Sequence, residues 1–288
     1  MSPSGLVCVD KPVGPTSHDV VARVRRIAGL RRAGHAGTLD PLASGLLLVC
    51  LGRATRLVEY LVGLDKVYET TIRLGRSTTT YDAEGEVTAE RPVSLTITEI
   101  DQALASFRGT IRQRVPPFSA VKQHGQPLYK MARRGERVDL PVREVTIHAL
   151  ELLAYEEPLL TLRVASSSGV YIRSLAHDLG EALGCGGHVV ALRRTAVGQF
   201  SLSQSVALDD LTSENLSGHL LPPAAAIAHL PRAEFDEASA IALGHGQSIH
   251  APDDAPAGDV AAFGPGEHFL GVVAAENGLW RPRKIIRG

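Results

Sequence analysis

The sequence predicts an α+β fold in which strands and helices are interleaved, rather than the regular strand–helix–strand repeat of a parallel sheet. Three observations lead to this prediction. Apolar and polar residues alternate in some segments, which is typical of half-buried strands, and apolar residues recur every three or four positions in others, which is typical of helices. Hydrophobic residues make up 44% of the 288 residues, so the chain can bury a substantial core.

The first half of the chain begins with a short apolar strand at Leu6–Val9, which a proline-rich turn follows. Ser17 stands at the N-cap position of a helix whose apolar residues keep helical spacing until Gly29 ends it. The later elements of this half are a buried strand at Leu46–Leu51, a helix around Leu57–Val62, an alternating strand from Tyr68 to Leu74, a turn at Asp82–Gly85 and a helix from Ile100 to Phe107.

The second half continues the mixture. Its expected elements are a short basic helix at Pro127–Arg134, strands near Val142–Leu153 and Leu159–Ala165, a helix from Ile172 to Leu183, and a strand at Val189–Leu202. After Asp209 the composition shifts to alanine, proline and acidic residues. We therefore expect a domain boundary near residue 225, with a large domain over 1–225 and a small, mainly β domain over 226–288.

Composition excludes several classes of protein. The three cysteines are far apart and form no C-x-x-C pair, which argues against a zinc site and a disulfide framework and fits a reducing cytoplasm. The amino terminus lacks the features of a signal peptide, and the longest apolar stretches are too short to span a membrane. We expect a cytoplasmic protein with no membrane association, no metal and no cofactor, and a monomer by default.

Charge is unevenly distributed along the chain. The formal net charge is −1, but the segment 108–143 contains nine Lys or Arg residues and two acidic ones. The acidic residues concentrate in 209–276, where eleven of them accompany one arginine. A basic segment within a chain of nearly neutral net charge predicts a phosphate-binding surface. For one cluster alone, an ordinary solvated face is at least as good an interpretation.

The segment Gly34–Gly45 carries the strongest chemical signal, since its sequence GHAGTLDPLASG leads directly into an apolar run. Asp40 lies there between a glycine-containing segment and Pro41, shortly before the predicted buried strand. Glycine permits unusual turns and proline fixes φ, so the loop can hold one carboxylate in a set position. A turn-forming aspartate is the ordinary alternative, and the rest of the chain has to decide between the two.

Three further strings accompany this loop in the chain. They are Asp10-Lys11-Pro12 with Thr16-Ser17, Ser167-Ser168-Gly169-Val170-Tyr171-Ile172-Arg173, and Gly187-His188-Val189 with Leu192-Arg193-Arg194. Together and in this order, the four resemble the TruB family of RNA pseudouridine synthases, bacterial enzymes that isomerise uridine 55 in the TΨC arm of tRNA. The likeness spans about residues 5–205. Ser166 and Val170 stand where the family often has cysteine and threonine.

The resemblance implies a fold and a substrate. The fold is a mixed, largely antiparallel sheet flanked by helices, with a PUA-like C-terminal domain that the tail resembles more loosely. Residues Ser119 to Lys122, with Tyr129 and Arg133, resemble the RNA-grasping insertion of the family, at about 108–143. The implied partner is the T stem-loop of tRNA. The expected phosphate contacts are Lys122, Lys130, Arg133, Arg134, Arg193 and Arg194.

The resemblance also assigns roles to site residues. Asp40 matches the catalytic aspartate and Arg173 the arginine paired with it. In the substrate-binding set, Tyr68 stacks on the target base, and Tyr171 and Leu192 line the uracil pocket. His35 occupies the space left by the flipped nucleotide, and Lys11 supports the site. From periodicity alone, a core residue is the favoured interpretation of Tyr68 and an equally good one of Leu192. A surface arginine at a helix start is the ordinary alternative for Arg173, and the surrounding string argues against it.

These residue types suit the chemistry that the resemblance implies. A base inside a folded stem-loop must be flipped out, and an aromatic ring then recovers stacking energy of roughly 1–3 kcal/mol. Asp40, ionised at neutral pH, either attacks C1′ or removes the 2′ proton, and the sequence leaves both routes open. Hydrolysis would use a second carboxylate to activate water, and none accompanies Asp40 in the segment Gly34–Gly45.

Two other classes of function compete with this one. A non-catalytic RNA-binding or tRNA-folding module would use the same basic segment and tail, but it has no need of an acid that faces a polyanion. A nucleoside hydrolase would need a metal-binding cluster of acids, which the motifs lack. His35 could also be a general base or a metal ligand, but the eleven histidines form no H-x-H or H-x-x-x-H pair.

Overall fold

The main sheet of the computed structural model is mixed and largely antiparallel. The structure describes residues 3–119, 121–123, 125–134 and 139–286, and within these ranges eleven strands form the sheet, whose central order is β14-β1-β3-β12-β4-β11-β10-β7. Strands β2, β13 and β15 pair with β3, β12 and β1. Among the described pairs of this sheet, β1–β14 and β3–β12 are parallel and the others antiparallel. The expected fold class is confirmed.

The bounds of these strands are β1 (Gly5–Lys11), β2 (Ala33–Ala36), β3 (Ala43–Leu51), β4 (Lys66–Leu74), β7 (Gly109–Arg114), β10 (Val142–Glu156), β11 (Leu159–Ser166), β12 (Gly187–Val197), β13 (Phe200–Ser201), β14 (Val206–Ala207) and β15 (Leu220–Leu221). Two small hairpins pair β5 (Arg76–Thr78) with β6 (Val87–Glu90), and β8 (Lys122–Gln123) with β9 (Gln126–Pro127). The predicted strand at Val189–Leu202 is divided in the structure, because the chain turns at Gly198, where φ is 51°.

The helices are α1 (Ser17–Ile27), α2 (Val58–Val62), α3 (Ile97–Ala105), α4 (Leu128–Arg133), α5 (Ile172–Ala182) and α6 (Glu237–Gly244), with short 3-10 turns η1 (Gly52–Leu57), η2 (Leu202–Gln204), η3 (Leu216–His219), η4 (Pro223–Ile227) and η5 (Pro265–Glu267). The N-cap of α1 is Thr16 rather than the expected Ser17, since Thr16 forms a capping box with Asp19. No helix among the described residues is long and apolar enough to cross a membrane.

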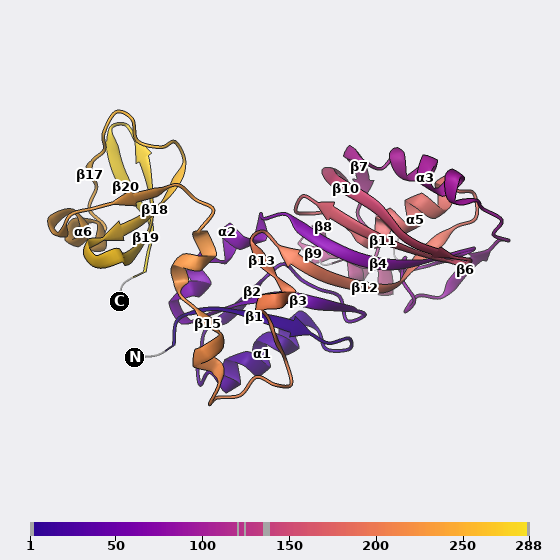
Figure 1. The fold of residues 1–288 in the computed structure, drawn as a ribbon, viewed down its shortest axis with the longest axis horizontal. Helices are drawn as coiled ribbons and strands as arrows, with labels where there is room; N and C mark the ends of the chain where they lie inside the picture. Colours follow the sequence, from indigo (N-terminus) through magenta and orange to yellow (C-terminus); the bar gives the residue numbers. More distant parts are fainter. Residues whose placement is uncertain (1–2, 120, 124, 135–138, 287–288) are drawn as a thin grey trace.

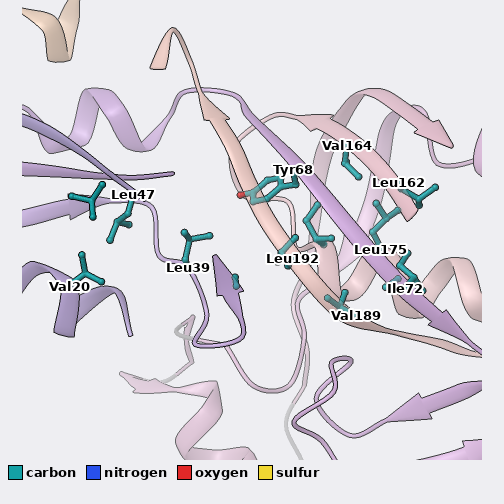
Figure 2. Close-up of a cluster of buried hydrophobic side chains, with 14 of the residues drawn as sticks. Val20, Leu39, Leu47, Tyr68, Ile72, Leu162, Val164, Leu175, Val189 and Leu192 are labelled. Carbon is teal, nitrogen blue, oxygen red and sulfur yellow. The ribbon is translucent and has the colours of Figure 1, made fainter. Parts of the chain in front are cut away.

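Two apolar clusters cover the main sheet. One joins the sheet to α1, α3 and α5 through side chains such as Val20, Ile100 and Leu175. Figure 2 shows part of this cluster, in which the Tyr68 hydroxyl is directed away from Ile72 and Leu162. The other cluster contains the opposite face of β1 and β3 together with η1, α2 and η4. The first cluster supports the pocket described below.

A second sheet lies at one end of the molecule, drawn in yellow in Figure 1. Its described strands have the order β16-β18-β19-β20-β17 and the bounds β16 (Arg232–Glu234), β17 (Ile249–His250), β18 (Asp259–Gly264), β19 (His268–Glu276) and β20 (Leu279–Ile285). Helix α6 packs on it through Leu243. This mainly β unit fits the expected PUA-like fold. Val272 and Ile286 extend the second apolar cluster, so the two sheets share buried contacts.

Candidate active site

The loop between β2 and β3 holds Asp40 by its backbone. Lys11, at the end of β1, is fully buried, and its Nζ donates to the carbonyls of Ala43 at 2.6 Å, Pro12 at 2.9 Å and Pro41 at 3.5 Å. Ser17 at the start of α1 accepts from the Leu39 amide at 2.8 Å and donates to its carbonyl at 3.0 Å. Burial lowers the pKa of Lys11, and Asp40 opposes that effect.

Arg194 fixes the other side of the same loop. This side chain is 1% exposed, and its guanidinium donates to the carbonyls of Leu46 at 2.8 Å and Gly37 at 3.0 Å. Gly37 has φ 82°, and a Cβ there would lie 3.3 Å from Nη1 of Arg194. Both the positive φ and the close approach require glycine at this turn. Through Arg194, strand β12 thus holds the Gly37 carbonyl, where the loop begins.

Arg173 brings a guanidinium to Asp40. It lies in the first turn of α5, and its Nε is 2.9 Å from Oδ2 of Asp40. The Asp40 side chain is 38% exposed and the Arg173 side chain 5%, so the carboxylate is open to a ligand while its cation is buried. Arg173 also donates to the carbonyls of Thr80 at 3.0 Å and Phe118 at 2.9 Å. The pairing expected between these two residues is therefore present in the structure.

A second carboxylate, Asp82, contacts Arg173 through a different guanidinium nitrogen from the one that contacts Asp40. Its Oδ2 lies 3.2 Å from Nη1 of Arg173, and its side chain is 4% exposed. Oδ1 accepts from the Glu84 amide at 3.1 Å and from the Thr80 hydroxyl. Sequence reasoning missed Asp82, since it fell in a segment that predicted only a turn. A turn aspartate flanked by hydroxyl residues is a common pattern, so the sequence held no specific signal for this contact.

A pocket of about 390 Å³ opens beside Asp40. Tyr68 and Leu192 line it from strands β4 and β12, and Tyr171 lines it just before α5. Tyr68 and Leu192 are each 8% exposed and also belong to the apolar core, so the core and pocket interpretations both hold. Burial raises the pKa of Tyr171, which keeps its phenol protonated at neutral pH. The remaining polar and charged lining comes from Thr38, Lys66, Ser119, Ser168, Arg173 and Arg194.

Comparison with known proteins gives the family of the chain. Residues 25–172 match the family described as TruB family pseudouridylate synthase (N terminal domain), and residues 173–227 match the tRNA pseudouridylate synthase B C-terminal domain. The chain belongs to the TruB family of pseudouridylate synthases. The resemblance inferred from the four strings is thereby confirmed.

Relatives in this family are similar over nearly their whole length. The chain is 44% identical to tRNA pseudouridine synthase B of Pseudomonas aeruginosa (strain UCBPP-PA14), with 99% of this chain and 96% of the relative covered. It is also 44% identical to the protein of that name from Ralstonia pickettii (strain 12J), with 98% and 94% covered.

Two solved structures extend the comparison. One is an H/ACA RNP bound to a substrate RNA containing 2′-deoxyuridine, with TM-score 0.77, 27% identity, and 99% of this chain and 85% of that chain covered. The other is a Cbf5-Nop10-Gar1 complex, with TM-score 0.76, 28% identity and coverage of 98% and 84%.

Two residues expected to bind substrate lie outside the pocket lining of this TruB-family chain. Lys11 is fully buried, so its place fits support of the Asp40 loop and not a contact with substrate. His35 lies on β2, just before the loop, and packs edge-to-face on His18 with ring centroids 5.3 Å apart. Burial, with His18 and Arg194 nearby, lowers the pKa of His35. Neutral imidazole is thus its form at neutral pH.

The residues expected to contact RNA phosphates divide by exposure. Lys130 and Arg134, on and just after α4, are exposed, and Arg134 Nη2 donates to Oε1 of Gln126 at 2.7 Å. The side chains of Lys122 and Arg133 lie outside the described part of the structure. Arg193 is partly exposed and pairs with Asp10 at 2.7 Å.

Arg194 was expected to contact RNA phosphates, and this prediction is wrong. A side chain that is 1% exposed cannot be a surface phosphate contact. Successive side chains of a strand point to opposite faces, so Arg193 and Arg194 of β12 cannot both face solvent. The alternation of β12 could have given this result from the sequence.

Lys66 is a second residue that sequence reasoning missed. It begins β4, is 6% exposed, and lines the pocket two positions before Tyr68. Its Nζ donates to the carbonyl of Val62 at 2.6 Å and to that of Leu64. Among the described residues, no group of three or more His, Cys, Asp or Glu side chains is arranged to hold a metal ion.

Proposed function

We propose that this chain isomerises uridine to pseudouridine at position 55 of tRNA, which it binds through the T stem-loop. The observation that supports this most strongly is the open Asp40 carboxylate, which is paired with buried Arg173 at 2.9 Å in a pocket lined by Tyr68. The curated relatives named above are tRNA pseudouridine synthases. The expected roles of Asp40 and Arg173 as catalytic residues, and of Tyr68, Tyr171 and Leu192 as uracil-binding residues, form part of this proposal.

The geometry suits this reaction better than it suits RNA binding alone. A carboxylate repels a polyanion, so a module that only binds RNA gains nothing from an exposed acid held by a buried cation. The flipped uridine stacks on Tyr68, its ribose lies against Asp40, and the apolar wall that includes Leu192 limits the entry of water. Asp40 then either attacks C1′ or accepts the 2′ proton, and Arg173 keeps its carboxylate oriented.

The domain division and the setting belong to the same proposal. We place a catalytic domain at 1–225, with a basic RNA-binding insertion at about 108–143, and a PUA-like RNA-binding domain at 226–288. The chain acts as a monomer in the cytoplasm, where three buried free cysteines stay reduced, and the chemistry needs no cofactor. His35 fills the space that the flipped nucleotide leaves in the T loop.

The test is release of tritium from tRNA that carries uridine labelled at C5. The wild-type chain should release one tritium per tRNA, and the Asp40→Asn variant should release none above background while its affinity for tRNA stays close to that of the wild type. The amide has the shape of the acid but not its charge or basicity, so folding should be unaffected. Equal release by both proteins would contradict the catalytic role of Asp40.

A further inference from the structure

Lys66 is a buried cation whose place is not explained by the stability of the fold. Buried lysines are normally paired with a carboxylate. The nearest acid in sequence, Asp65, is 63% exposed in its side chain and lies 3.2 Å from Nε2 of His148. Lys66 instead has two carbonyl acceptors at the end of α2. An ammonium carries three N–H groups, so one has no acceptor among the residues that the structure describes.

Two cations flank the aromatic ring of the pocket. Lys66 and Tyr68 are two apart in β4 and lie on one face of the sheet. Arg194 of β12 is the register partner of Tyr68 in the antiparallel pair. A Cβ at Gly37 would lie 3.3 Å from Nη1 of Arg194 and 3.7 Å from Cε of Lys66, so the two side chains converge at this loop. A base stacked on Tyr68 would meet positive charge along its edge.

The charge balance of the pocket is positive. Among its described lining residues, Asp40 is the one carboxylate, and Lys66, Arg173 and Arg194 are cations. Arg173 is already shared between Asp40 and Asp82. Burial and the like charge of Arg194 lower the pKa of Lys66 to about 8, against the attraction of Asp65. The ammonium therefore stays mainly charged at neutral pH in an environment that favours the arrival of an anion.

The reaction proposed above supplies such an anion. When the N1–C1′ bond breaks, the bonding electron pair leaves with the uracil, and its negative charge spreads over N1, O2 and O4. C1′ gains either an oxygen electron pair from Asp40 or the electron pair of the C2′–H bond as that proton passes to Asp40. The base turns, and C5 bonds to C1′ as the oxygen of Asp40 leaves C1′ or, on the other route, as Asp40 returns the proton to C2′. C5 then loses its proton and N1 gains one, so the product is an isomer of the substrate.

We propose that Lys66 is a catalytic group that donates its third N–H to a uracil oxygen and stabilises the negative charge of the detached base. This inference rests on the proposed function and extends it to a residue on the leaving-group side of the reaction. Charge that develops in a site shielded from water is stabilised most by cations already fixed in place. Asp40 acts on the sugar, and Lys66 acts on the base.

The first experiment compares Lys66→Met with the wild-type chain at saturating enzyme in a single turnover on uridine-containing tRNA. We expect the rate to fall on the order of 100-fold, as for the loss of one charge-stabilising donor, with tRNA affinity unchanged. Arg23→Met is the matched control, because it also removes one positive charge, here from an exposed pair with Asp209 at 2.6 Å. The control should keep the wild-type rate.

The second experiment changes the leaving group. Fluorine at C5 withdraws electrons and makes the uracil anion more stable, so a substrate with 5-fluorouridine at the target position depends less on Lys66. In this substrate C5 has no proton to lose, so the C5-linked product keeps its fluorine and takes up water at C6. Its formation is followed by chromatography after digestion of the RNA. We expect the ratio of wild-type to Lys66→Met rates to shrink at least about tenfold relative to uridine.

The outcomes of the two experiments either support or overturn the catalytic role of Lys66. An equal rate ratio for the two bases, or no loss of rate on uridine, overturns the assignment, because a residue that only shapes the pocket does not respond to the acidity of the base. If Lys66→Met fails to fold, Lys66→Gln keeps a donor for the Val62 carbonyl without the charge, and the same ratio is measured. A wild-type chain that leaves uridine unchanged would instead contradict the proposed function itself.

Discussion

At the scale of single residues, the site depends on a guanidinium held between two carboxylates. Arg173 contacts exposed Asp40 through Nε and buried Asp82 through Nη1. Two carbonyls complete its contacts, so its orientation is fixed before any ligand enters. A catalytic carboxylate held by a rigid partner needs little reorganisation during the reaction. Asp82 is thus a positioning residue that acts on Asp40 through Arg173.

The Asp82→Asn variant tests this positioning. The amide keeps the shape of Asp82 but removes the charge that faces Nη1 of Arg173. We expect the activation free energy to rise by about 1.5–3 kcal/mol, so that the single-turnover rate falls roughly 10- to 150-fold, with tRNA affinity retained. Asp101→Asn is the control, since Asp101 is 63% exposed at 3.4 Å from Arg108 and such pairs contribute little. Equal rates for the two variants would contradict the role of Asp82.

Lys66 also predicts a dependence of stability on pH. Its pKa in the folded chain is about 8, against an ordinary value of 10.5, so between these values the unfolded chain binds the proton and the folded chain releases it. The free energy of unfolding therefore gains up to about 3 kcal/mol as pH rises through this window. Lys66→Met should lack this gain in urea unfolding at pH 7.5 and 10.5. An identical pH dependence for both proteins would contradict the buried ammonium.

At the scale of elements, strand alternation places the site residues. Lys66, Tyr68 and Thr70 share one face of β4 and are all buried. The sequence predicted this alternation, the strand itself, and the place of Asp40 before β3. It could not predict that β3 runs parallel to β12 next to β4, because register depends on contacts between segments that are distant in the sequence. The contact of Asp82 with Arg173 likewise joins segments that are distant in the sequence, and it was missed for that reason.

Gly45 allows β3 to pass β12 beside the Asp40 loop. It has φ 101°, and a Cβ there would lie 2.2 Å from the carbonyl oxygen of Arg194 and 2.7 Å from its amide nitrogen. Backbone atoms of a central strand cannot move away, so we expect Gly45→Ala to lower the free energy of unfolding by at least about 3 kcal/mol. Gly63→Ala is the control, because its φ is −73° and no heavy atom lies within 4 Å of a Cβ.

Thermal and urea unfolding measure both glycine variants. The control should remain within about 1 kcal/mol of the wild type, since alanine fits the backbone of Gly63. A Gly45→Ala protein as stable as the control would show that the strands can separate at this point. The sequence alone favoured glycine here only as part of a bend-permitting loop, whereas the structure assigns it to a close approach of two paired strands.

At the scale of the whole molecule, the net charge of −1 conceals two kinds of basic residue. In the second sheet, Arg232 pairs with Glu267 at 2.8 Å and Arg283 pairs with Glu276. Lys130 in the basic insertion is exposed and forms no ion pair with a described residue. The sequence predicted the basic insertion from composition, but which cations are balanced by acids depends on the fold. The unbalanced ones are those that a polyanion can use.

Salt dependence of tRNA binding separates these two kinds of cation. A lysine that neutralises one phosphate releases about one counterion, so the slope of log affinity against log salt concentration should become shallower by roughly 0.7–0.9 in Lys130→Gln. The Arg232→Gln control should keep the wild-type slope, because the charge of Arg232 is already balanced by Glu267. Filter binding between about 50 and 200 mM salt resolves this difference. Equal slopes for the two variants would place the T stem-loop away from α4. We expect Lys130→Gln to match the wild-type single-turnover rate at saturating enzyme, because Lys130 acts on binding and not on the isomerisation of the base.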